Sequence, residues 1–428
     1  MNKNKSLFAF LVIGILIKFF LMAVSFHGDL AFIWAIPSSV KIGDIFNFYK
    51  DYSQRFPDFY RSVSTVYYPP LSLAFVALFL PVLRLFSSSL QPWLLNLQHM
   101  LFFGQASSGK ELYINSIHKG IIFDLWLLKV PYLLVDLVIA WMIWKSSGQK
   151  IKQKLLLLWW FNPINLYVTY MMGQIDIVIA FFLVAAVLLV KKNNLAALVS
   201  VVAALMVKTY ALAVVPAFYL IKQTYKQVVV LIMASVVIVL LTIYPFVKAD
   251  SGSIISAFFP KIMASPISCE FRPDAFWSCG KLLTTAGVLI YGLWLISNSG
   301  QLIEKKLFIY LITGWLALSY FAYRGLLINH YLVLVPFLNF IWIKAGKMYK
   351  IFIFNLLIFM VFVYVRPLMG ELFVPTGIER IIYATDLRDL AAPWVRYENI
   401  AFIARTLLDI LLLQVALSSI RKCLIKTP

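Results

Sequence analysis

The sequence predicts an all-α, polytopic membrane protein, and three observations support that prediction. Hydrophobic residues make up 62% of the 428 residues and charged residues only 13%, which is more apolar surface than a soluble fold can bury. The apolar residues form continuous runs, whereas the strands of a membrane β-barrel alternate apolar and polar residues. Basic residues gather in short segments between these runs, as they do in cytoplasmic loops.

The net charge of +20 is mostly a signal of topology and does not indicate nucleic-acid binding. Of the 38 basic residues, 18 lie in short segments that contain a single acid, Glu304. They are Lys3, Lys5, Lys145, Lys150, Lys152, Lys154, Lys191, Lys192, Lys222, Lys226, Lys305, Lys306, Lys344, Lys347, Lys350, Arg421, Lys422 and Lys426. Such segments mark the cytoplasmic side, so both termini are expected there.

The first apolar run, 7–24, is expected to be a retained membrane helix. Lys18 interrupts it and no small-residue cleavage site follows, which argues against a signal peptide. Residues 27–66 then form the first outer loop. They are too charged to span a membrane and too apolar to be disordered, so we expect helices that lie along the membrane surface.

The next apolar run, 71–86, begins after Pro69-Pro70, a pair that starts a helix cleanly. The run that follows, 90–103, either completes a hairpin through the membrane or lies in the interface. The sequence does not decide between them, though the distribution of basic residues requires an even number of crossings between Asp29 and Ile121.

The run 121–144 carries two charges, Lys129 and Asp136, at membrane depth. Charges there are costly, and they are usually paired or functional. Their separation of roughly two helical turns puts them on similar faces without direct contact.

The remaining apolar runs complete a single membrane domain over 1–428. They are 155–170, 177–190, 195–207, 211–221, 228–247, 282–297, 307–323, 331–343, 351–365 and 400–420. The run 211–221 is short and broken by Pro216, as helices are where they line a cavity enclosed by protein. With outer loops at 248–281 and 366–399, about 12 to 14 crossings are expected.

Chemistry is expected at polar clusters on the outer side, because metal-ligand spacings, nucleotide-binding loops and a Ser nucleophile motif are absent from the sequence. The clusters are Asp29, Gln174 with Asp176, Lys208, residues 270–274, and Arg324 with His330. Each alone is more typical of helix capping or interface anchoring. Their common placement on one face favours a shared site.

Several of these stretches resemble motifs of the GT-C glycosyltransferases, in the family's order, over about 26–336. They are Gly28-Asp29 with Trp34, Tyr68-Pro69-Pro70-Leu71, Lys129-Val130-Pro131 with Val135-Asp136-Leu137, Phe161-Asn162-Pro163, Gly173-Gln174-Ile175-Asp176, Val207-Lys208, and Glu270-Phe271 with Ala275-Phe276-Trp277. The set is most similar to the dolichyl- or polyprenyl-phosphate-glucose (or mannose)-dependent enzymes. The chain departs from the family pattern at Tyr67, where the family has Asp, and at Asn329-His330-Tyr331, where it has His-Glu-Lys or His-Glu-Arg.

The resemblance implies a GT-C-like bundle and a membrane hexosyltransferase that acts on the outer face. It would move a hexose from a polyprenyl-phosphate donor to a lipid-linked or cell-envelope glycan by an inverting single displacement, without a metal, a cofactor or nucleic acid. The residues it implicates are Asp29 as base, Lys208, Arg324 and His330 for the donor phosphate, and Trp34, Tyr68, Gln174, Asp176 and Trp277 for acceptor and sugar. The short chain indicates a prokaryotic cell-membrane enzyme that uses undecaprenyl or another polyprenyl carrier.

Two other functions fit parts of the pattern. A transporter or flippase of lipid-linked sugars would line its path with Lys129 and Asp136, but the sequence lacks the internal repeat typical of transporters. An oligosaccharide polymerase or ligase also uses a lipid-linked donor, and only its products distinguish it. Cys269 and Cys279, both in an outer loop, either form a disulfide or remain as two thiols.

Overall fold

The computed structural model describes residues 3–39, 69–102, 118–208, 307–322, 328–361 and 397–425, with isolated positions between 211 and 244. Every element within these residues is a helix, so the predicted all-α class is confirmed for the described chain. Two helical stretches, Lys5–Val24 and Ile403–Cys423, are long and apolar enough to cross a membrane.

Several predicted segments lie outside the described residues. They are the surface helices of 40–66, the loop 248–281, nearly all of the loop 366–399, the span 282–297, and most positions of 211–221 and 228–247, together with Cys269 and Cys279.

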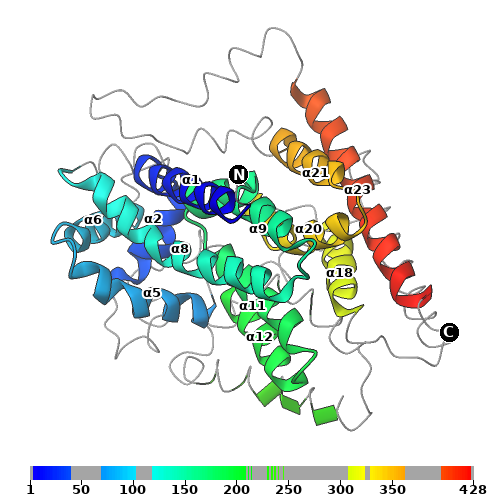
Figure 1. Cartoon of the computed structure of the whole chain (residues 1–428). Coiled ribbons are helices and arrows are strands. Elements are labelled where there is room, and N and C mark those ends of the chain that lie inside the picture. The colour runs from blue at the N-terminus through cyan, green and yellow to red at the C-terminus, as the bar shows by residue number, and fades with distance from the viewer. Residues whose placement is uncertain are drawn as a thin grey trace.

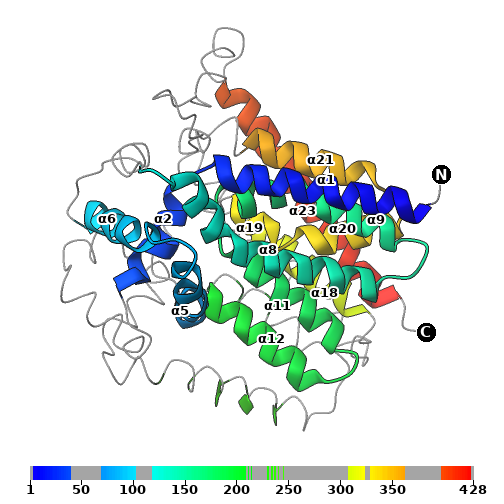
Figure 2. The ribbon, with the colours of Figure 1, turned by 60° about the vertical axis from the view of Figure 1, so that its left-hand side comes forward.

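One group of helices forms the amino-terminal half of the bundle. In chain order these are α1 (Lys3–Val24), α8 (Ile121–Ser146), α11 (Asp176–Leu189) and α12 (Asn194–Val207). Each packs on the next, and Figure 2 shows the four lying alongside one another, with α8 running back against α1 and α12 back against α11. Predicted runs 121–144, 177–190 and 195–207 therefore match helices within a few residues.

The carboxyl-terminal half consists of α18 (Phe308–Ala322), α20 (Val335–Lys344), α21 (Tyr349–Phe359) and α23 (Tyr397–Ile425). The pair α18 and α23 lie side by side (Figure 1), and α20 joins the two halves by packing on α9 (Lys152–Trp160). Close approach of the pair depends on Gly314, because a Cβ atom there would lie 2.9 Å from the Cβ of Ser419.

Two predicted single helices are interrupted. The run 155–170 divides into α9, a short turn α10 (Pro163–Asn165) and a π-helical turn η3 (Leu166–Met171). The break is local, because Asn162 Oδ1 accepts the backbone N–H groups of Ile164 and Asn165 and so starts a new helix. Pro163 cannot continue α9, since it has no N–H to donate. In the same way, 331–343 divides into α19 (Ile328–Leu332) and α20, with Pro336 in the first turn of α20.

The helices α5 (Pro70–Arg84) and α6 (Leu90–Phe102) lie across one end of the bundle (Figure 2). Ser72 at the start of α5 donates to the Val207 carbonyl at the end of α12, at 2.6 Å. Ser89, just before α6, donates to Asp124 in the first turn of α8, at 2.7 Å. The start of α5 and the connection between α5 and α6 are thus tied to the same end of the bundle. Whether 90–103 completes a hairpin through the membrane or lies in the interface stays a prediction.

Candidate functional site

The candidate site is built around a tight turn at Gly173, which directly follows η3. Gly173 has a φ of +69°, a left-handed conformation that glycine adopts without steric cost. A Cβ atom at this position would lie 2.5 Å from Leu30 Cδ1, so any other residue would also force the Leu30 side chain of α2 (Gly28–Ala35) to move. The backbone N–H of Gln174 donates to the Val168 carbonyl at 3.0 Å and holds the turn. As a result, Gln174 meets the start of α2.

Asp29 lies in the first turn of α2, where the helix dipole favours a carboxylate. Its Oδ2 atom accepts a hydrogen bond from Gln174 Nε2. Its backbone N–H donates to His27 Nδ1 at 3.1 Å, which makes that ring nitrogen an acceptor. The side chain of Asp29 is 33% exposed, so the carboxylate is reachable from outside while one of its oxygens is fixed by the protein.

Lys208 is the cation of the site. It caps the carboxyl end of α12, where the helix dipole favours positive charge. Its ammonium lies 2.6 Å from Asp176 Oδ2 and donates to Gln174 Oε1 at 3.1 Å. Asp176 in turn lies in the first turn of α11, at the end that favours a carboxylate. The two charges therefore meet where the ends of neighbouring helices α11 and α12 come together.

Asn329 in α19 completes the group by donating from Nδ2 to Asp176 Oδ2 at 3.1 Å. Sequence reasoning singled out its neighbour His330 and missed Asn329. The contact with Asp176 is made by the amide, whereas the His330 carbonyl accepts a hydrogen bond from the Tyr320 hydroxyl at 2.8 Å. An amide immediately before His330 in an apolar run was the signal that could have identified it.

These contacts form one continuous chain, which we call the outer network: His27, Asp29, Gln174, Lys208, Asp176 and Asn329. Four predicted site residues, Asp29, Gln174, Asp176 and Lys208, are brought together in it. Asp176 is fully buried and Lys208 is 14% exposed, so Asp29 is the most accessible of the three charges. An accessible carboxylate beside a fixed ammonium can accept a proton next to a bound anion.

The other predicted site residues are placed differently. Trp34 is fully buried, and its indole N–H donates to the Tyr132 hydroxyl at 3.0 Å. It lies on the buried side of α2, packs against Phe75 and Tyr132 as a core residue, and does not present its ring to solvent. Tyr68, Arg324 and Trp277 lie outside the described residues.

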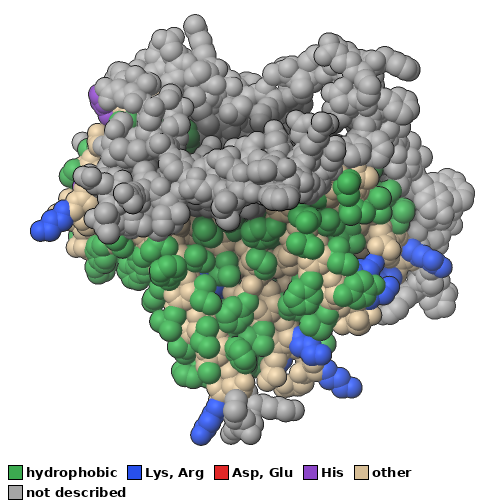
Figure 3. Space-filling view, turned by 90° about the horizontal axis from the view of Figure 1, so that it is seen from above, with side chains coloured by type: hydrophobic (Ala, Val, Ile, Leu, Met, Phe, Trp, Pro, Cys, Tyr) green, Lys and Arg blue, Asp and Glu red, His purple; other side chains and the backbone are tan. Residues whose placement is uncertain are grey.

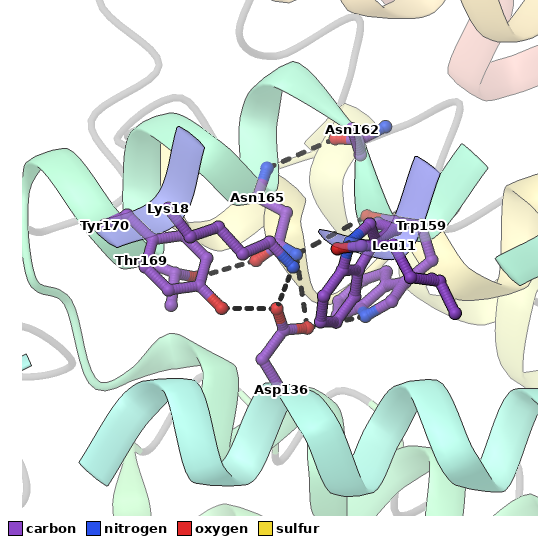
Figure 4. A network of polar contacts seen from close by, with 9 residues as sticks. Leu11, Lys18, Asp136, Trp159, Asn162, Asn165, Thr169 and Tyr170 are labelled. Carbon is purple, nitrogen blue, oxygen red and sulfur yellow. Dashed lines mark hydrogen bonds and ion pairs between the residues drawn. The ribbon is translucent and has the colours of Figure 1, made fainter. Parts of the chain in front are cut away.

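A second polar network, deeper in the bundle, centres on Asp136 (Figure 4). Its Oδ2 atom lies 2.6 Å from Lys18 Nζ, with both side chains fully buried, and also accepts the Tyr170 hydroxyl. Its Oδ1 atom accepts from Trp159 Nε1 at 2.6 Å and from Asn165 Nδ2 at 3.3 Å. The buried carboxylate is thus paired and hydrogen-bonded, as such groups must be. These four donors tie α1, α9, α10 and η3 to α8.

Lys129 on α8 is held by oxygen atoms of the chain rather than by a carboxylate. Its ammonium donates to the Ser25 carbonyl at 2.5 Å, to Ser25 Oγ at 2.9 Å and to the Met22 carbonyl at 3.2 Å. A weaker contact, at 3.4 Å, reaches the Met171 carbonyl. Lys129 therefore joins the end of α1, which leads to Asp29, to the end of η3, which leads to Gln174.

Within the described residues, no group of three or more His, Cys, Asp or Glu side chains is arranged to hold a metal ion. Comparison with known proteins gives no relative of the chain. No family model matches it, and no curated protein and no solved structure is significantly similar to it.

Proposed function

We propose that this chain is a multi-pass membrane glycosyltransferase that moves a hexose from a polyprenyl-phosphate donor to a lipid-linked or cell-envelope glycan on the outer face. The observation that carries the proposal is the outer network, in which an accessible carboxylate, Asp29, is joined through Gln174 to a fixed ammonium, Lys208. The ordered resemblance to GT-C motifs supports the same assignment.

The surface of the bundle supports a lipid environment. Large apolar side chains point outward along whole helices, including Phe8, Leu16 and Phe20 on α1 and Leu134, Phe352 and Ile410 on α8, α21 and α23. In the described part of the face drawn in Figure 3, hydrophobic side chains predominate, and Lys and Arg stand at its border. Soluble proteins rarely expose so large a continuous apolar surface.

The ends of the bundle support the orientation. Figure 2 shows both termini and the connection between α8 and α9 at one end, and α2, α5 and α6 at the other. The first end carries basic residues of the described chain, among them Lys145, Lys150 and Lys422, which the positive-inside rule assigns to the cytoplasm. The outer network lies next to α2, so it belongs to the outer side in this orientation.

The transfer proposed is a single displacement. The acceptor hydroxyl oxygen forms a bond to the anomeric carbon while its proton passes to Asp29, and the bond between that carbon and the phosphate oxygen breaks. The electron pair leaves with polyprenyl phosphate, so the configuration inverts and no protonated acid is needed. Lys208 stabilises the departing phosphate by a charge-assisted hydrogen bond.

The direct test is to incubate the purified full-length protein with polyprenyl-phosphate glucose and polyprenyl-phosphate mannose, each with and without a membrane-glycan acceptor fraction. We expect release of polyprenyl phosphate that depends on the acceptor and on one of the two donors. A flippase would move the donor between leaflets of a vesicle without releasing polyprenyl phosphate. A polymerase or ligase would instead consume a lipid-linked oligosaccharide, so either result would overturn the proposal.

A further inference from the structure

We infer that Gln174 is a positioning residue for the base, which orients Asp29 and couples it to Lys208, and that it does not bind sugar. The inference rests on the proposed function. It follows from the way the buried Gln174 amide is used, with its nitrogen donating to Asp29 and its oxygen accepting from Lys208. Neither the motif resemblance nor the residue types alone reveal this arrangement.

The direction of the Gln174 amide is fixed by its neighbours. The Lys208 ammonium can only donate, so the atom that it meets at 3.1 Å must be the carbonyl oxygen Oε1. The amide nitrogen Nε2 must then face Asp29 Oδ2. The reversed amide would set two donors against each other at Lys208 and two acceptors against each other at an ionised Asp29.

The amide is also held in place. Gln174 is buried, its backbone N–H is bonded to Val168, and the preceding Gly173 packs against Leu30. Lys208, in turn, is fixed by its ion pair with Asp176. A side chain with both ends engaged and almost no exposed surface is poorly suited to contact a sugar, and well suited to hold a carboxylate in one orientation.

The consequence for the reaction is that the two oxygens of Asp29 differ. Oδ2 is engaged by Gln174, whereas no donor among the described residues is bonded to Oδ1. The proton of the acceptor hydroxyl is therefore received at Oδ1. Gln174 also links the base to the cation that holds the departing phosphate. One side chain therefore contacts both Asp29 and Lys208.

Three variants of the full-length protein test this assignment. Gln174→Leu removes both contacts and is expected to lower kcat by about 10- to 100-fold, a fraction of what general-base catalysis contributes. The KM for the donor should change by no more than about 3-fold, because the loss falls on the transition state. Asn329→Leu is the matched control, since it removes one contact to Asp176 on the far side of Lys208 and should act mainly on donor KM.

Gln174→Glu is nearly isosteric and tests the polarity directly. Its carboxylate can still accept from Lys208 but faces Asp29 with like charge, so the acidic limb of the kcat/KM profile should move to higher pH. The charged or titratable groups that face this pair in the described chain are His27 from the same turn, Lys208 from α12 and Asp176 from α11. Asn329→Leu leaves all of these beside Asp29, and its acidic limb should stay within about 0.3 units of the wild-type limb.

The inference is overturned if Gln174→Leu keeps its kcat and raises a substrate KM, because that is the behaviour of a sugar-binding residue. It is also overturned if the Gln174→Glu limb coincides with the wild-type limb. A wild-type protein that releases no polyprenyl phosphate from any donor would overturn the proposed function instead. In that case the contact is tested without turnover, by infrared pH titration of the carboxyl band that Asp29→Asn removes, which Gln174→Glu should shift and Asn329→Leu should not.

Discussion

Asp29 and Asp176 belong to the same hydrogen-bonded network, yet their surroundings differ in a way that separates their roles. Asp176 is fully buried and is neutralised by Lys208 at 2.6 Å, so it serves to fix the cation. Asp29 is one-third exposed, and its Oδ1 atom accepts no hydrogen bond from the described residues. At the scale of single residues, the accessible acid is the one that can receive a proton.

Replacing Asp29 by Asn is expected to abolish most turnover while donor binding survives. The amide oxygen can still accept from Gln174, but the group cannot take up a proton at working pH. Loss of a general base lowers the rate by about 10²–10⁴-fold. Single-turnover rates and donor affinity of the purified variant are the measurements. Near-normal turnover by a folded Asp29→Asn protein would exclude this mechanism.

Replacing Lys208 by Ala should give the opposite pattern. The variant would lose the proposed charge-assisted contact to the donor phosphate, and it leaves Asp176 buried without its cation. We expect donor affinity to fall by about 10-fold or more, the equivalent of one such hydrogen bond. Lys191→Ala, an exposed lysine at the opposite end of α12, is the control and should bind donor normally. Equal donor affinity in both variants would contradict the assignment.

At the scale of elements, the site depends on how closely a turn and a helix approach. Gly173 and Gly28 both lie next to network residues, but only Gly173 is confined. Its φ is +69° and a Cβ atom there would meet Leu30, whereas a Cβ atom at Gly28 would meet nothing within 4 Å.

Gly173→Ala and Gly28→Ala therefore form a matched pair. The first is expected to destabilise the protein by about 1–2 kcal/mol from the left-handed backbone alone, with the contact to Leu30 adding to it. It should also displace Gln174 and lower activity. The second should leave thermal stability in detergent unchanged. Two variants that unfold at the same temperature would show that the turn is not constrained as described.

The deeper network determines where α1 sits. In lipid, apolar contacts between helices are no better than contacts with lipid tails, so polar links have a larger part in fixing one helix against another. Two lysines provide such links between α1 and α8. The Lys18 side chain of α1 binds Asp136 of α8, and the Lys129 side chain of α8 donates to the Ser25 carbonyl just after α1 ends. The position of Asp29 follows from them, because α2 begins four residues after α1 ends.

Lys18→Met should be strongly destabilising, by about 3–5 kcal/mol, because it leaves the Asp136 carboxylate buried without a cation. The double variant Lys18→Met/Asp136→Leu removes both charges and should recover a large part of that loss. Thermal unfolding of the two proteins in the same detergent is the measurement. A double variant less stable than the single one would contradict the view that the unpaired charge is the cause.

At the scale of the whole molecule, the orientation can be tested in cells. In a background without the native cysteines, Ser88→Cys places a thiol on the exposed connection between α5 and α6, and Lys150→Cys places one on the connection between α8 and α9. A membrane-impermeant thiol reagent should label position 88 in intact cells, and position 150 only after permeabilisation. Protection of position 88 would mean that α5 crosses the membrane, and labelling of position 150 would reverse the orientation.

Hydropathy predicted where the helices lie but not how they meet. The runs 177–190 and 195–207 became α11 and α12 almost unchanged, because each run is a single uninterrupted apolar segment. Motif order singled out Asp29, Gln174, Asp176 and Lys208, yet it gave no information on which atoms bond to which. Lys18 and Asp136 are separated by 118 residues and Asn329 and Asp176 by 153, and a pattern read within single segments cannot report such pairs.

The pairing of Lys18 with Asp136 also sets an order of events during synthesis. The two charges lie on helices that leave the ribosome 118 residues apart, so α1 is made long before its counter-ion exists. In the membrane placement proposed above, the ammonium of Lys18 would have to be accommodated by water at the membrane surface or by the insertion machinery until α8 arrives, since an unpaired charge is costly within lipid. Trp159, Asn165 and Tyr170 emerge only after Asp136, so the carboxylate gains its remaining donors last. In that placement, the polar contacts of the amino-terminal half would form in chain order, because each partner of Asp136 after Lys18 is synthesised later than Asp136 itself.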